Sequence, residues 1–122
     1  MNAHLELRAK LAGGDRRSIG RADPVAAQAA NDPELCAALV GLLSDRDSRV
    51  AMRAADALEK STRQRTDLLA PSKAVLVGLL LDASRAEVLW HLLQMLPRLP
   101  LTQEERRVLA PKVHAFPSHP SR

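Results

Sequence analysis

Two stretches of the chain, 49–60 and 87–98, carry apolar residues at the same positions when one is shifted by 38 residues along the other. The shift pairs Val50 with Val88, Ala54 with Leu92, Ala57 with Met95 and Leu58 with Leu96. Apolar residues at this spacing line one face of an α-helix, and each stretch follows an acidic turn and another apolar helical stretch. A helix pair repeated at this period predicts an all-α fold, a short α-solenoid.

Start and stop signals divide the chain into seven expected helices. Proline directly after aspartate begins two of them, at Asp23-Pro24 and Asp32-Pro33, and Thr102 with Glu105 forms a capping box for the last. The expected helices lie at about 5–12, 24–30, 33–44, 48–61, 67–81, 87–96 and 103–114. We call the first helix of each pair its A helix and the second its B helix.

The helices of the last part of the chain have predictable apolar faces. The expected buried residues are Val75, Leu76, Leu79 and Leu80 in the fifth helix, with Pro71 in its first turn, and Val108, Leu109 and Val113 in the last. We therefore expect one repeat domain over 1–114 with about three helix pairs, the last incomplete, and a disordered tail over 115–122. The last helix is an A helix without a B helix, so either it caps the array or the chain is a truncated form of a longer array. Because its apolar surface is uncovered, a homodimer through this incomplete repeat is a further expectation.

The composition supports helices and limits the chemistry. Of the 122 residues, 46% are hydrophobic but only 2% are aromatic, so the core must consist of Leu, Ala and Val. The single cysteine, Cys36, excludes an internal disulfide framework and a multi-cysteine metal site, and its apolar neighbours predict that it is buried. The sequence shows neither a signal peptide nor an apolar run long enough to span a membrane, which favours a cytoplasmic protein.

The segment 45–58 resembles the core of HEAT repeats, in which Asp, Val, Arg and Ala recur in this order. The second copy departs from that pattern at Glu87, His91 and Gln94, and the resemblance covers residues 32–100. The segments 14–21 and 90–99 are also similar to small bacterial HEAT-repeat proteins of unassigned function. The resemblance implies a right-handed superhelix whose B helices line the concave face, and a binding role without catalytic residues.

Polar residues share one face of each expected B helix, opposite the buried stripe. These polar residues, the predicted stripe, are Arg49, Arg53, Asp56 and Lys60 on the first and Glu87, His91, Gln94 and Arg98 on the second. If B helices line the concave face, the stripe is a recognition surface for an acidic peptide or a nucleic-acid backbone. The alternative is a solvated face, with Arg53 paired to Asp56 and Arg49 to Glu87. A third interpretation has Arg53 brace the neighbouring repeat.

Three further features are candidate sites. Trp90 is either a partner anchor or a packed core residue, and His91 has Met95 rather than a ligand four residues later, so we expect no metal and no cofactor. A secondary basic cluster, formed by Arg16, Arg17 and Arg21, either binds phosphate or is neutralised by neighbouring aspartates.

The sequence favours a non-catalytic scaffold or adaptor that binds another protein with an acidic surface or peptide. The alternative is a nucleic-acid-binding protein of the kind seen in the HEAT-like alkylpurine DNA glycosylases, which the net charge of +4 permits. The scarcity of aromatic residues for base stacking makes that alternative weaker. No Ser-His-Asp, Cys-His or paired-His arrangement occurs, so we do not expect an enzyme.

Overall fold

The computed structural model describes residues 7–9, 11, 22–82 and 86–115, and in these ranges all regular structure is helical. The elements are α2 (Ala22–Ala29), α3 (Pro33–Leu42), α4 (Ser48–Ser61), η2 (Thr66–Ser72), α5 (Lys73–Asp82), α6 (Ala86–Met95), η3 (Leu96–Arg98) and α7 (Gln103–Ala115), where η marks a 3₁₀-helix. Residues 7–9 and 11 are also helical, and Leu7 and Leu11 are buried. The all-α prediction is confirmed.

Side-chain caps set the helix starts where the sequence predicted them. The Asp32 carboxylate accepts hydrogen bonds from the backbone N–H groups of Glu34 and Leu35, at 3.1 and 3.2 Å, and Pro33 begins α3. The predicted capping box is confirmed, because the Thr102 hydroxyl accepts from the Glu105 N–H at 3.1 Å and the Glu105 carboxylate accepts from the Thr102 N–H at 2.8 Å. Helix α2 differs from the prediction, because it begins at Ala22 and so contains Asp23 and Pro24 as its second and third residues.

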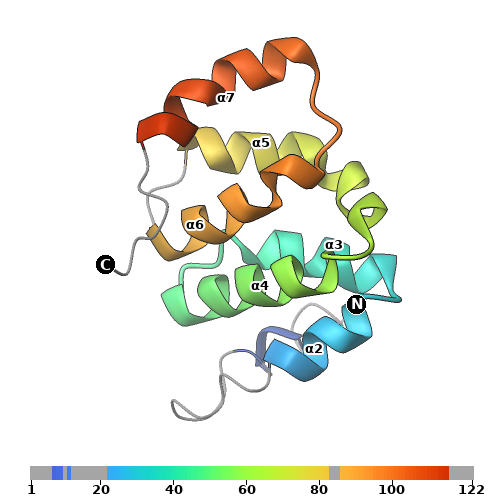
Figure 1. Cartoon of the computed structure of the whole chain (residues 1–122). Coiled ribbons are helices and arrows are strands. Elements are labelled where there is room, and N and C mark those ends of the chain that lie inside the picture. Colours follow the sequence, from blue (N-terminus) through green and yellow to red (C-terminus); the bar gives the residue numbers. More distant parts are fainter. Residues whose placement is uncertain (1–6, 10, 12–21, 83–85, 116–122) are drawn as a thin grey trace.

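The helices stack as pairs, in chain order from α2 at the bottom of the view to α7 at the top (Figure 1). The B helix α4 contacts its own A helix α3 and also the preceding and following B helices, α2 and α6. The next pair consists of η2 and α5 as the A part and α6 as the B helix, and α7 packs on α5. This arrangement is the short solenoid of helix pairs that the 38-residue period predicted.

The predicted apolar stripes form the centre of the core. On α4, Val50, Ala54, Ala57 and Leu58 are fully buried, and on α6 so are Val88, Leu92 and Met95, while Leu96 is half-buried. Ala51 and Ala55 are buried as well, so small side chains on several sides of α4 let neighbouring helices approach closely. The 38-residue match therefore marks the face on which the repeats stack.

The structure corrects the predicted apolar faces of the last repeat. Val75, Val108 and Val113 are 53%, 45% and 37% exposed, although Leu76, Leu80 and Leu109 beside them are buried. No further described helix follows α7 to cover its valines. The single helix expected from Thr66 or Asp67 is also two elements, because Pro71 lies inside the 3₁₀-helix η2 and α5 begins at Lys73.

The remaining expectations concern the ends of the chain and its relation to membranes. Helix α7 reaches Ala115, one residue into the expected tail, and residues 116–122 lie outside the described part. None of the helices described here has the length and apolar character needed to cross a membrane.

Candidate interaction surface on the B helices

The predicted stripe separates into surface residues and buried residues. Arg49 and Gln94 are exposed, and Asp56, Lys60 and His91 are half-buried at the surface. The side chains of Arg53 and Arg98 turn inward instead. The side chain of Glu87 and the whole basic cluster of Arg16, Arg17 and Arg21 lie outside the described residues.

Arg53 is a buried brace, so the prediction that it lies on an exposed stripe is wrong. It is only 5% exposed, and its guanidinium Nη1 donates a hydrogen bond to the carbonyl oxygen of Leu11 in the preceding repeat. Its Nε has no hydrogen-bond partner in the part of the chain that the structure describes. The physical reason is that α2, α3 and α6 cover α4 on three sides, which leaves little of this helix facing water. The third interpretation, an arginine that braces the neighbouring repeat, describes this geometry.

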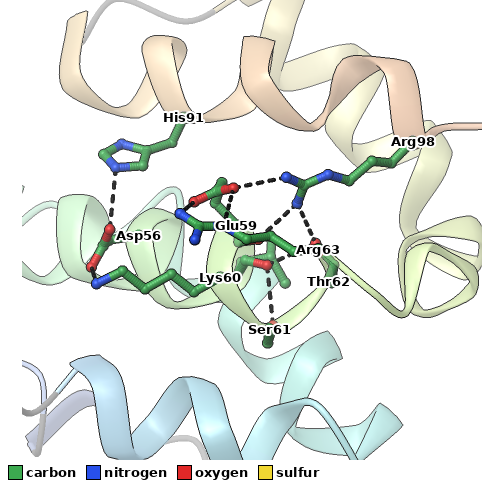
Figure 2. A network of polar contacts seen from close by, with 9 residues as sticks. Asp56, Glu59, Lys60, Ser61, Thr62, Arg63, His91 and Arg98 are labelled. Carbon is green, nitrogen blue, oxygen red and sulfur yellow. Dashed lines mark hydrogen bonds and ion pairs between the residues drawn. The ribbon is translucent and has the colours of Figure 1, made fainter.

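Arg98 is a second brace, between η3 and α4. Its guanidinium binds the Glu59 carboxylate at 2.7 Å, the Glu59 carbonyl oxygen at 2.7 Å and the Thr62 hydroxyl at 3.0 Å. Arg63 binds the same carboxylate through two hydrogen bonds of 2.8 and 2.9 Å (Figure 2). One buried carboxylate is thus shared by two guanidinium groups from successive repeats.

The guanidinium groups keep this buried carboxylate ionised. Glu59 is 5% exposed, and the hydrogen bonds from Arg63 and then from Arg98 lower the pKa of its carboxyl group against the opposing effect of burial. Sequence reasoning missed Glu59, Thr62 and Arg63. Glu59 and Arg63 could have been found, because they form an i, i+4 Glu–Arg pair at the end of α4. Nothing in the sequence placed Arg98 against that pair.

Asp56 is the centre of a second polar cluster, on the surface. Its carboxylate pairs with Lys60 at 3.0 Å and with the His91 Nε2 at 3.5 Å (Figure 2). The pKa of Asp56 is lowered, first by the hydrogen bond from His91 and further by Lys60. The expected Arg53–Asp56 pair is therefore replaced by one contact within α4 and one across to α6. Arg49 pairs with Asp47 at 3.6 Å.

Trp90 lies next to this second cluster. It is half-buried, and its ring meets the His91 ring edge-on, with centroids 5.2 Å apart. This contact holds the imidazole beside Asp56, so Trp90 serves packing as well as presenting part of its ring to solvent.

Three arginines make hydrogen bonds between successive repeats of the array. Arg8 binds Asp45 through two hydrogen bonds of 2.6 and 3.0 Å, Arg53 reaches Leu11, and Arg98 reaches Glu59. The partners are separated by 37, 42 and 39 residues, close to the repeat period. These arginines therefore hold neighbouring repeats together.

The single cysteine lies in the core. Cys36 is buried as predicted, its Sγ lies 3.2 Å from the Ala29 carbonyl oxygen, and burial raises the pKa of the thiol, which disfavours the reactive thiolate. No group of three or more His, Cys, Asp or Glu side chains among the residues searched could hold a metal ion.

Comparison with known proteins agrees with the fold. The family model of the HEAT repeat domain matches residues 7–109, so the chain belongs to the HEAT-repeat family. No curated protein and no solved structure matches the chain. HEAT repeats are helical scaffolds that commonly mediate protein interactions.

Proposed function

We propose that this protein is a non-catalytic scaffold or adaptor that binds another protein through the exposed side of α4 and α6. The B-helix surface, as we name it, consists of Arg49, Asp56, Lys60, Arg63, His91 and Gln94. All six side chains reach solvent. Five of them come from α4 and α6, which pack against each other, and Arg63 lies two residues after the end of α4.

The charge balance of the B-helix surface favours a partner with carboxylates. The single observation that carries the proposal is that Asp56, the one carboxylate among these six residues, is matched by two nitrogen donors, Lys60 and His91. Arg63 in turn shares the buried Glu59 carboxylate with Arg98. The Arg63 and Arg49 side chains keep 59% of their surface exposed. The B-helix surface is therefore positive, and an acidic peptide or protein face complements it.

A nucleic-acid partner has weaker support. Asp56 lies in the middle of the surface, where it would repel a phosphate backbone, and the one aromatic side chain nearby, Trp90, is committed to His91. Binding of single strands without sequence preference usually requires several stacking platforms in a positive groove.

The experiment captures partners from native lysate on the immobilised chain, identifies them, and measures their affinity for purified variants. We expect the combined variant Arg49→Ala, Lys60→Ala and Gln94→Ala to bind the main partner with an affinity lower by about tenfold or more. The reason is that charged and polar contacts of the surface are lost together. The matched control replaces Arg46 and Arg107, which are exposed arginines outside the B-helix surface.

Two outcomes would contradict the proposal. One is a partner whose affinity is the same for the combined variant and for the control. The other is retention of DNA or RNA that weakens steeply as salt rises, which is the behaviour of phosphate-backbone binding.

A further inference from the structure

An apolar groove lies beside the last described helix, α7. It has a volume of about 340 Å³ and one charged lining residue, Arg106. Its apolar lining residues are Leu96, Pro97, Leu99, Leu101, Leu109, Ala110 and Val113. Leu99 and Leu109 are buried in its floor, while Val113 is exposed at its lip. An exposed apolar wall of this kind marks a surface that gains free energy when another apolar group covers it.

The packing of the earlier repeats indicates that a helix fits the groove. Helix α4 lies against the preceding B helix α2 and its own A helix α3, and α6 lies in the same way against α4 and α5. The groove lies at the C-terminal end of the next such position, between η3, which follows the B helix α6, and the A helix α7. Because two successive helices with an apolar stripe fill the earlier positions, a third one fits here.

The groove differs in charge from the position that α6 fills. Where α6 packs on α4, the earlier helix α4 supplies a carboxylate, Glu59. The segment that packs on it supplies Arg98, from η3 after α6. Pro97 stands 38 residues after Glu59, so the carboxylate has no counterpart in the next repeat. The charge at the edge is instead the exposed Arg106, which makes no ion pair with any of the described residues.

We propose that this groove docks one amphipathic helix of a partner protein, which lies beside η3 and α7 as α6 lies beside α4 and α5. The docked helix turns an apolar stripe toward Leu99, Leu109 and Val113 and places a carboxylate against Arg106. This second binding surface shares no residue with the B-helix surface.

A second copy of this chain fits the groove less well. A symmetric dimer uses the same patch on both subunits, so it would bring two copies of Arg106 to one interface. Both carboxylates of α7 already have partners, Glu104 with Arg107 at 3.1 Å and Glu105 with Lys73 at 3.0 Å. The charge therefore favours an acidic partner helix.

The test uses the full chain and two synthetic peptides. Each is a helical peptide of about 15 residues with Leu at an i, i+3, i+4, i+7 spacing, flanked by glutamates in one peptide and by lysines in the other. We expect the glutamate peptide to bind about tenfold more tightly than the lysine peptide, measured by fluorescence anisotropy. Arg106→Glu should reverse this preference, and because Arg106 is exposed the variant should fold normally.

Val113→Asp should lower the affinity for the glutamate peptide by about tenfold, because it places a charge on the apolar edge of the groove. Val108→Asp is the matched control, since Val108 is an exposed valine on the same helix that does not line the groove. Lys60→Ala, in the B-helix surface, should leave peptide affinity unchanged, which separates this proposal from the proposed function.

Three results would overturn the inference. The first is that neither peptide binds, and the second is that Val108→Asp and Val113→Asp weaken binding equally. The third is a dimer in analytical ultracentrifugation that Val113→Asp dissociates, because the occupant of the groove would then be a second copy.

Discussion

Helices α4 and α7 show how the two regions of this array differ. Nine residues of α4 are buried, including the charged Arg53 and Glu59, whereas Leu109 is the one buried residue among the described side chains of α7. The difference comes from neighbours: α4 has contacts with α2, α3 and α6, and α7 packs mainly on α5. Whether a side chain of this solenoid is buried therefore depends on the position of its helix in the array as much as on its spacing along that helix.

The largest expected effect separates these two regions directly. Leu58→Ala removes a fully buried side chain from α4, and we expect the free energy of unfolding to fall by about 3 kcal/mol, because the transfer term and the cavity add. Val108→Ala in α7 should cost less than about 0.5 kcal/mol, since Val108 is largely exposed. Urea unfolding followed by circular dichroism measures both, and similar losses would mean that α7 is packed as tightly as α4.

A somewhat smaller effect is expected at the Arg53 brace. Arg53→Ala leaves a cavity and takes the hydrogen-bond donor away from the Leu11 carbonyl oxygen, so we expect a loss of about 2 kcal/mol. The same unfolding measurement applies, and hydrogen exchange should show that residues around Leu11 and α2 lose protection first. Unchanged protection there would contradict the assignment of Arg53 as a brace between repeats.

Acid should weaken the central repeat. The pKa values of Glu59 and Asp56 are lowered in the folded chain, so the unfolded chain binds more protons below the ordinary pKa values of 4.5 and 3.8. The stabilisation is therefore present above those values and is lost as pH falls through them. Urea unfolding between pH 7 and pH 3 measures the loss, and Glu59→Gln should make it shallower; an equally steep loss in that variant would assign the acid sensitivity to other groups.

The exposed valines should matter least to folding. Val75→Ser and Val113→Ser should each change the free energy of unfolding by less than about 0.5 kcal/mol, because these side chains already contact water. A thermal unfolding scan measures this. A large loss for Val113→Ser would show that a neighbouring molecule covers α7 in solution, and its dependence on protein concentration would identify a second copy.

Much of the fold could be predicted from the sequence, because the 38-residue period and the caps at Asp32 and Thr102 are local signals. The roles of Arg53 and Arg98 could not. Spacing along one helix places both opposite the buried stripe, but whether that side meets water or the adjacent repeat depends on how the repeats stack. The exposure of Val108 and Val113 escaped prediction for the same reason, since their burial would require a neighbour that the described chain does not supply.

The most direct test of the account compares Lys60 and Arg98, which occupy the same position in successive copies of the repeat. The structure makes Lys60 part of the B-helix surface, paired with Asp56 within one helix, and makes Arg98 a brace, with a side chain only 17% exposed, that binds Glu59 in the preceding repeat. The decisive measurement is the free energy of unfolding of Lys60→Ala and Arg98→Ala in urea. We predict a loss of about 2 kcal/mol for Arg98→Ala and under about 0.5 kcal/mol for Lys60→Ala. Equal losses would contradict the division of the predicted stripe into braces and binding surface.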